Sequence, residues 1–443
     1  MTVTAGANKQ ASEVNNTLKT AGGFVQHILG LDDRLFLTTS VRVDRNSASG
    51  TLSKTIAYPK ASLSYLISEA GFFPKGNFLN SLRFRASYGH AGQQPGGSVA
   101  IESYFASAAA VGGTVQPAIL LNNIGDPSLK PERSVEYEGG FDATFLNSRL
   151  ALEVTAFHKN TRDALIFVPT PLSAGNPAGQ FRNLGEVMNE GIEYLIDAQV
   201  LAGKTIKWDL TLSGSFLKNR LLNLGKQLPI LANGVDQQHR EGYPLGGYWA
   251  RRYTYADANS DQIIAASEVT AEDTLAYVGP SQPTREVALT SGIGLFDGRL
   301  QISAQLDYRG GARLYNLTED FRCRSSQNCW GLYDINAPIE EKARVTALRF
   351  LGAKNSRFGY MEDADYIKWR ELSVTYNAPK TWARALGGDR LGITLSGRNL
   401  WTSTKYTGID PEVNGQGEAN FAQRDFLSLP SLRSYNVRLN LGF

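Results

Sequence analysis

Hydrophobic and polar residues alternate one by one along most of this chain. In the final segment one face collects Tyr435, Val437, Leu439, Leu441 and Phe443, and the residues between them are polar or glycine. Because successive side chains of a strand point to opposite sides, this alternation predicts a β-strand with one apolar face. Twelve further segments share the pattern, near residues 21–30, 35–43, 57–67, 80–90, 134–145, 149–159, 192–200, 206–216, 284–295, 300–308, 366–377 and 391–401. The sequence therefore predicts an all-β protein of thirteen strands, with room for a partial strand before residue 20.

The links between the predicted strands alternate strictly between short and long. The shorter links fall at 31–33, 68–79, 146–148, 201–204, 296–298 and 378–390, and the intervening links have about 12, 43, 30, 66, 56 and 29 residues. Compact soluble domains rarely contain structureless loops beyond about 15 residues. Outer-membrane barrels, in contrast, combine short periplasmic turns with long extracellular loops. Together with strands of about 9–11 residues, this pattern favours an antiparallel transmembrane β-barrel over a soluble β-protein with one wet face.

Composition and the chain start narrow the classes further. The 45 Lys and Arg against 42 Asp and Glu leave a net charge of +3, without the concentrated basic face of a nucleic-acid binder. No stretch approaches 18 uninterrupted apolar residues, so no transmembrane helix is predicted. The first residues lack the features of a signal peptide, and thirteen strands is an odd number where bacterial barrels are even. Both observations lead us to expect part of a longer barrel.

Seven motifs occur in a specific order along the chain. They are RLFLTTSVRVD at 34–44, LRFRASYG at 82–89, LKPER at 129–133 followed by Glu136, Glu138 and Gly140, NEGIE at 189–193, DYIKWRELSVTY at 365–376, GRNL at 397–400 and YTGIDPE at 406–412. Together they resemble the SusC/RagA family of TonB-linked outer-membrane receptors. The resemblance implies a 22-stranded barrel, in which residues 1–443 form a partial receptor domain with roughly the last thirteen or fourteen strands. The plug domain and the N-terminal strands would be absent, so TonB gating cannot be located on these residues.

The resemblance also implies a function. A receptor of this family, in the outer membrane of a Gram-negative bacterium, would import large oligomers such as glycans or peptides, with the TonB complex acting through the missing N-terminal part. A SusD-like lipoprotein would close the mouth, and the loops at 91–133, 218–283, 310–365 and 402–430 would carry that contact and part of the substrate site. The alternative is a passive porin or an adhesion barrel without TonB coupling. The four histidines are scattered and neither HExxH nor GxSxG occurs, so a barrel enzyme is the weaker possibility.

The terminal strand and the strand ends suggest contacts with the membrane and its machinery. A strand such as Tyr435–Val437–Leu439–Leu441–Phe443, ending on an aromatic residue, resembles the signal read by the barrel-assembly machinery; otherwise Phe443 is an ordinary interfacial residue. Aromatic rings suit the boundary between lipid and water, and we expect them there at the strand ends. The candidates are Tyr88, Tyr308, Tyr376, Trp401 and Tyr435.

One acidic segment has the spacing of a calcium-binding loop. Asp257, Asn259, Asp261, Ile263 and Glu268 stand at positions 1, 3, 5, 7 and 12, which supply oxygen ligands in an EF-hand-type loop. The sixth position, where such a loop turns sharply and uses glycine, is Gln262. The sequence indicates no required cofactor, and Ca²⁺ in this loop is the one candidate. The alternative is an acidic loop that is only solvated.

Two further loop features carry candidate functions. Cys323 and Cys329, with no other cysteine or histidine nearby, do not make a zinc site, and outside the cell they favour a local disulfide over two free thiols. Aromatic residues surround two arginines just before the acidic loop, and such a group can stack on sugars or bind a partner; packing of the loop on itself explains the same composition. The group comprises Tyr248, Trp249, Arg251, Arg252 and Tyr253, with Tyr243 and Tyr255 beside it.

Overall fold

The computed structural model describes residues 19–47, 55–74, 76–96, 99–168, 179–225, 230–231, 236–415 and 423–443, with the single positions 17, 170, 173 and 421. Its main element is one antiparallel sheet of thirteen strands, which confirms the predicted number. They are β1 (Thr20–Leu31), β2 (Leu35–Asn46), β3 (Ile56–Leu66), β4 (Leu79–Ala91), β7 (Arg133–Phe145), β8 (Leu150–Arg162), β11 (Glu186–Ala202), β12 (Ile206–Asn223), β19 (Arg285–Leu295), β20 (Leu300–Gly310), β23 (Tyr366–Asn377), β24 (Arg390–Thr404) and β26 (Ser434–Gly442). The partial strand expected before residue 20 falls on positions outside the described residues.

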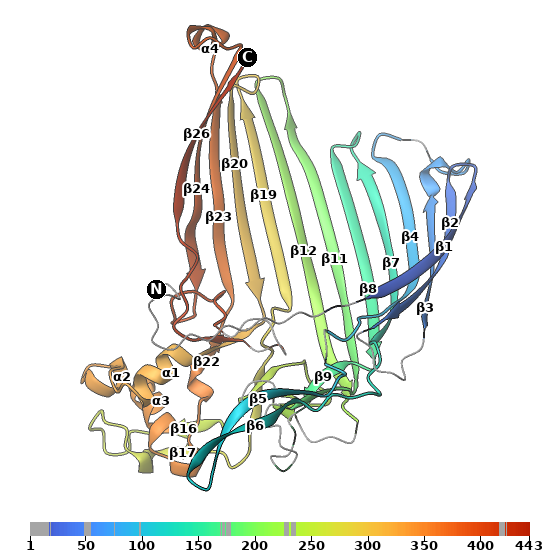
Figure 1. Ribbon diagram of the computed structural model, residues 1–443. Helices are drawn as coiled ribbons and strands as arrows, with labels where there is room; N and C mark the ends of the chain where they lie inside the picture. Colours follow the sequence, from blue (N-terminus) through green and yellow to red (C-terminus); the bar gives the residue numbers. More distant parts are fainter. Residues whose placement is uncertain are drawn as a thin grey trace.

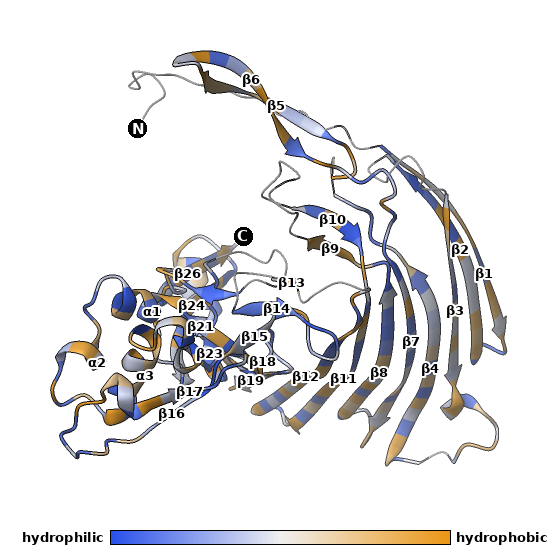
Figure 2. Cartoon of the chain, turned by 90° about the horizontal axis from the view of Figure 1, so that it is seen from below, coloured by the Kyte–Doolittle hydropathy of each residue, from blue (hydrophilic) through white to orange (hydrophobic). Residues whose placement is uncertain are grey.

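Each of these strands pairs with the next one along the chain, so the sheet has a simple meander order. Figure 2, seen from below, shows the sheet as an open arc that runs from β1 to β26. Within the described residues β1 and β26 each have one neighbour, and the arc does not close. Both edges therefore present backbone groups that further strands could pair with.

The register keeps the two faces of the sheet separate. Leu212 lies opposite Leu289 and Leu289 lies opposite Leu306, on the apolar face. One position away, Thr211 lies opposite Thr290 and Thr290 lies opposite Gln305, on the polar face. Since a slip of one residue would exchange the faces, the alternation in the sequence fixes this register. The predicted separation into an apolar and a polar row is confirmed for these strands.

Short and long links lie at opposite ends of the sheet, as predicted (Figure 1). The short-link end carries the turns at 32–34, 146–149, 203–205 and 296–299, together with η2 (Ile67–Glu69) and α4 (Lys380–Ala385). Strands β11 and β12 have 17 and 18 residues, more than the 9–11 expected. Both extend toward the loop end, where residues such as Lys218 and Asn219 continue the ladder with polar side chains.

The long links are folded, which the sequence did not predict. Their described residues contain three α-helices, α1 (Leu317–Arg324), α2 (Trp330–Tyr333) and α3 (Ile339–Arg349), three 3-10 helices, η4 (Ala266–Glu268), η5 (Gly352–Lys354) and η6 (Phe358–Tyr360), and a set of strands. The strands are β5 (Ser103–Val111), β6 (Thr114–Asn123), β9 (Leu165–Val168), β10 (Gln180–Asn183), β13 (Ile230–Leu231), β14 (Gln237–His239), β15 (Gly247–Ala250), β16 (Tyr253–Tyr255), β17 (Val269–Ala271), β18 (Ala276–Gly279), β21 (Arg313–Asn316), β22 (Met361–Asp363) and β25 (Arg424–Asp425). No helix in the described ranges is long and apolar enough to cross a membrane.

Candidate functional site

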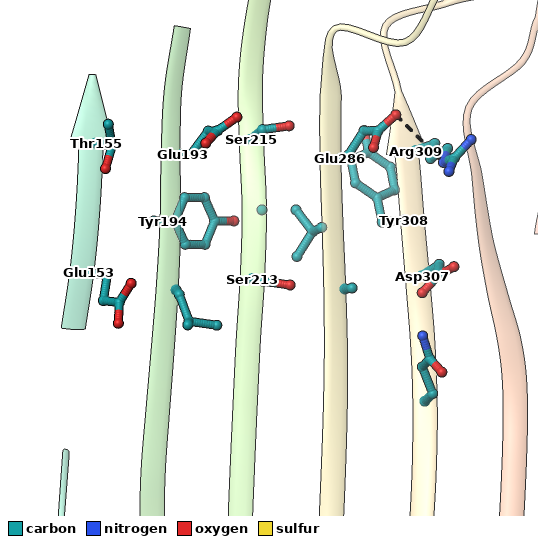
Figure 3. Close-up of a pocket in the computed structure, with 15 residues that line it drawn as sticks. Glu153, Thr155, Glu193, Tyr194, Ser213, Ser215, Glu286, Asp307, Tyr308 and Arg309 are labelled. Atoms are coloured by element: carbon teal, nitrogen blue, oxygen red, sulfur yellow. Dashed lines mark ion pairs between the residues drawn. The ribbon is translucent and has the colours of Figure 1, made fainter. Parts of the chain in front are cut away.

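Two rows of mainly polar side chains cross the wall made by β8, β11, β12, β19 and β20. The residues of each row lie directly opposite one another in successive strands, so alternate positions of five strands share one surface. The first row is Thr155, Glu193, Ser215, Glu286 and Arg309, and the second is Glu153, Leu195, Ser213, Ala288 and Asp307. These residues line a shallow hollow of about 590 Å³ (Figure 3).

The wall carries more carboxylates than cations. Glu286 lies 3.6 Å from the Arg309 guanidinium, and Asp307 lies 2.6 Å from that of Arg370. Glu153 and Glu193 have no ion-pair partner within 4.0 Å in the described part of the chain. Exposed carboxylates accept hydrogen bonds from hydroxyl, amide and ammonium groups, so this surface can hold a hydrated polar ligand through many weak contacts.

A β-bulge in β23 places additional charges on the polar face. The pairing of β20 with β23 shifts register between Gln305 and Leu306, which leaves Arg370 of β23 as an extra residue. Because a bulge re-aims the side chains around it, Lys368 and Glu371 both face the polar side, opposite Asp307 and Gln305. The Arg370 side chain reaches the same side, where its Nε donates to Asp307 at 2.6 Å.

The last long link is bound to this bulge by a buried ionic network. Lys368, only 3% exposed, donates to Asp410 at 2.7 Å and to Glu412 at 2.5 Å. Arg370 binds both carboxylate oxygens of Glu412, one of them at 2.7 Å. Burial alone would raise the pKa of Glu412, but the hydrogen bonds from Arg370, Lys368 and Tyr366 outweigh it and hold this pKa below its usual range. The network therefore attaches the YTGIDPE segment at 406–412 to the barrel wall.

A second hollow lies between this network and the loops. It has a volume of about 710 Å³ and is lined by polar and planar side chains, including Gln282, Arg309, Arg313, Tyr366 and Glu412. Arg309 lines both hollows, so they are neighbours on the wall. Together they form a polar surface that leads from the loop end onto the sheet.

The aromatic group before the acidic loop is mostly internal. Tyr248 is 0% and Trp249 4% exposed, and the Trp249 ring contacts Tyr243, Tyr277 and the Arg240 guanidinium, which stands 3.8 Å from the ring centre. Tyr248 and Trp249 therefore pack inside the loop, as the second of the two alternatives expected, and they are not available to a ligand. Of the remaining three residues, Arg252 is exposed and Arg251 and Tyr253 are half-buried.

Two carboxylates of the acidic loop accept hydrogen bonds from backbone N–H groups of the same loop. Asp257 accepts the N–H groups of Asp261 and Gln262 at 3.1 and 3.0 Å, and Glu268 accepts those of Ala258 and Ala265, both at 2.9 Å. Asn259 donates to Asp261 at 2.8 Å, whereas Ile263 is 61% exposed. In the described residues the only group of three or more His, Cys, Asp or Glu with all donor atoms within 4.8 Å is Glu319, Cys323 and Cys329. The carboxylates of the acidic loop are therefore not gathered around a point.

Cys323 and Cys329 form a disulfide inside the folded loops. Both cysteines are 1% exposed and belong to a core of buried residues from several long links. The disulfide is therefore shielded from solvent. The other core members are Tyr248, Ala250, Tyr315, Val345, Leu348, Tyr360 and Met361.

The residues of the proposed assembly signal lie on an edge strand. Tyr435, Val437 and Leu439 pair with apolar-face positions of β24 and are 72%, 71% and 68% exposed. Leu441 is half-buried, and Phe443, just beyond β26, is 88% exposed. The signal itself stays a prediction.

The sequence analysis missed the ionic network, although the pattern contained a sign of it. Arg370 and Glu371 are adjacent polar residues within an alternating segment, and such a break in the period indicates a bulge. The carboxylates that Lys368 and Arg370 bind in the last link lie more than 40 positions away, and no periodicity connects these residues.

Comparison with known proteins identifies the family. Residues 2–400 match the family model described as TonB dependent receptor-like, beta-barrel. TonB-dependent receptor P3 of Formosa agariphila and TonB-dependent receptor SusC of Bacteroides thetaiotaomicron are both 24% identical over 93% of this chain, and 44% and 43% of their own lengths are covered. The chain thus spans less than half the length of these relatives.

Solved structures agree on the fold. The structure of the RagAB peptide transporter matches with a TM-score of 0.77 and 19% identity over 96% of this chain and 49% of that one. The RagAB peptide importer in its open-open state matches with a TM-score of 0.72 at the same identity, over 100% and 49%. The resemblance to SusC/RagA receptors is confirmed, and with it the outer-membrane β-barrel class. The chain belongs to the TonB-dependent receptor-like β-barrel family.

Proposed function

We propose that this chain forms the transport wall of a TonB-dependent importer that carries large oligomers, glycans or peptides, across the outer membrane. The observation that carries the proposal is the continuous polar face of thirteen paired strands. At about 4.8 Å between neighbouring strands, this face spans roughly 60 Å of arc. A lumen bounded by an arc of this length is wider than a small solute needs. The two neighbouring polar hollows on the wall suit a ligand with many hydroxyl or amide groups.

Energy dependence distinguishes this proposal from a passive porin or an adhesion barrel. Cells that carry the intact receptor should take up a labelled oligosaccharide or a labelled oligopeptide of similar mass only when TonB is functional. Uptake that continues at the same rate after removal of TonB would support the porin, and binding without uptake would support the adhesion barrel.

We further propose that a SusD-like lipoprotein covers the loop end and contacts the β5–β6 hairpin. This hairpin is isolated from other strands, and a two-stranded ribbon alone is marginally stable in water. It exposes large apolar side chains, and contiguous patches of this kind mark protein contacts. The most exposed are Tyr104 at 60%, Val115 at 77% and Ile119 at 75%.

Co-purification tests this contact. The double variant Val115→Asp/Ile119→Asp should lose most of the lipoprotein that co-purifies with the intact receptor. Ile335→Asp, at a loop position that is 78% exposed, is the matched control and should retain it. Equal retention by both variants would remove the hairpin from the interface.

Calcium at residues 257–268 is a separate proposal that rests on ligand spacing. To bind the ion, Asp257 and Glu268 would exchange their backbone N–H donors for Ca²⁺. Calcium should then raise the thermal midpoint of the loop in the intact receptor, and Asp257→Asn should abolish the rise. A midpoint that is the same in calcium and in chelator would reject the site.

A further inference from the structure

Helix α4 (Lys380–Ala385) is held at the short-turn end of the sheet, beside the end of the chain (Figure 1). Its carboxyl end is closed by Gly387 and Gly388, whose N–H groups donate to Arg384 and Ala383 at 3.0 and 2.9 Å. Gly387 has a φ of 79°, which favours glycine. Directly after this turn, the Asp389 N–H donates to the Gly442 carbonyl of β26 at 2.7 Å. The helix is therefore fixed over the ends of β24 and β26.

The apolar residues of this helix continue the apolar face of the sheet. Ala383 is fully buried, whereas Trp382 and Leu386, four positions apart, are 53% and 59% exposed. The Trp382 ring contacts the Tyr376 ring edge-on, with 6.1 Å between centroids. Tyr376 lies opposite Leu300 on the apolar face. An indole beside the last lipid-facing position of a strand stands at the level where hydrocarbon gives way to headgroups.

Other short turns support the same level for the membrane boundary. At or next to four of these turns, a large apolar side chain is exposed and is not covered by any other described part of the chain. They are Leu31 at 61%, Phe78 at 70%, Leu146 at 49% and Phe296 at 60%.

The polar residues of the helix are cationic. Lys380 and Arg384 are also four positions apart and exposed, and neither has a carboxylate within 4.0 Å in the described residues. Asp389 is the sole acidic residue between 379 and 390. Guanidinium and ammonium groups bind phosphate oxygens, and the combination of an exposed indole with neighbouring cations is typical of segments that lie in a membrane interface.

We propose that α4 is an interfacial anchor that binds anionic phospholipid of the leaflet on the short-turn side. Trp382 and Leu386 enter the boundary between headgroups and acyl chains. Lys380 and Arg384 bind the lipid phosphates from the aqueous side. The anchor fixes the height and tilt of β23, β24 and β26 in the bilayer.

Tryptophan fluorescence of the intact receptor in nanodiscs tests the position of the helix. The signal of Trp382 is obtained as the difference between the wild-type receptor and Trp382→Phe. Acyl-brominated phosphatidylglycerol should quench this difference signal at least twofold, whereas iodide in the buffer should have little effect. A signal that is open to iodide and unaffected by brominated lipid would overturn the proposal.

Native mass spectrometry tests the lipid contact. The double variant Lys380→Gln/Arg384→Gln should retain at most half of the phosphatidylglycerol that the wild-type receptor retains, with heat-modifiable migration confirming that it folds. Lys130→Gln/Arg252→Gln, which removes two exposed cations at the loop end, is the matched control and should retain the wild-type amount. Equal retention by the two variants, or displacement of the lipid by free phosphate, would contradict a lipid site at α4.

Discussion

Gln262 has a backbone φ of 61°, in the left-handed region that glycine adopts without cost. It stands at the sixth position of the 257–268 loop, where the ligand spacing led us to expect glycine. Its N–H donates to Asp257 at 3.0 Å and its carbonyl accepts from Lys342 at 2.8 Å. The loop thus keeps its sharp turn with a residue that disfavours it, and contacts with Asp257 and with α3 compensate for the strain.

Replacing this residue by glycine should stabilise the loop. Gln262→Gly removes a left-handed non-glycine residue, and we expect the local free energy of opening to rise by about 1 kcal/mol. Hydrogen exchange of residues 257–268 in the intact receptor measures this opening. Ala266→Gly, in the same loop but at a residue without positive φ, should lower it by about 0.5–1 kcal/mol. Faster exchange in Gln262→Gly than in the wild type would contradict the strain.

At the scale of elements, the bulged strand β23 and the last long link act as one unit. Four charged groups pair between them: Lys368 and Asp410 are buried, and Arg370 and Glu412 are half-buried. A buried ion pair loses about 3–5 kcal/mol when one partner is removed, because the other charge is left uncompensated. The link should therefore detach from the wall when this network is broken.

Acid should weaken the attachment of this link. Since the pKa of Glu412 is depressed in the folded protein, its contribution is lost progressively as the pH falls toward and through that lower pKa, and it is fully present above the ordinary glutamate pKa of 4.5. Proteolysis within residues 405–433 should accelerate below that pH, and Glu412→Gln should show the fast rate at neutral pH. Glu340→Gln, at an exposed position, should behave as the wild type. If Glu412→Gln is cleaved at the wild-type rate at neutral pH, the ionic network does not hold the last long link on the wall.

The two faces of β20 allow a direct comparison of lipid and lumen. Ile302 lies opposite Ile293 and Val374, whereas the next residue, Ser303, lies opposite Gly292 and Ser373. Ile302→Arg should destabilise the intact receptor by about 2–4 kcal/mol if the site is near the bilayer midplane. Ser303→Arg should cost much less, as measured by denaturant unfolding in lipid. Equal costs would mean that the faces are assigned incorrectly.

The sequence predicted the elements that show a hydrophobic period within their own residues. Alternation alone located all thirteen strands and both faces, because a strand with one face in lipid cannot slip by one residue. It did not predict the helices and small sheets of the long links. Their stability comes from contacts between distant segments, such as the packing of Tyr248 with Tyr315 and Tyr360 in the loop core. The composition around Tyr248 and Trp249 therefore fitted a binding surface and internal packing equally well, and the structure places both side chains in the interior.

At the scale of the whole molecule, the described sheet is an arc with two free edges. Each unpaired backbone group in hydrocarbon costs on the order of several kcal/mol, far more than a marginally stable fold can absorb. In planar bilayers, this 443-residue polypeptide by itself should give no discrete single-channel conductance. A stable monomeric pore would show that β1 and β26 find partners within the chain.

The alternation of apolar and polar residues assigns one face of this sheet to lipid and the other to a water-filled lumen. Single cysteines along β20 of the intact receptor in nanodiscs, each carrying a nitroxide label, test it most directly. Labels at 300, 302, 304 and 306 should collide with oxygen dissolved in the lipid, and labels at 301, 303, 305 and 307 with a water-soluble nickel complex. Collision rates that show no period of two, or the opposite phase, would contradict this assignment of the two faces.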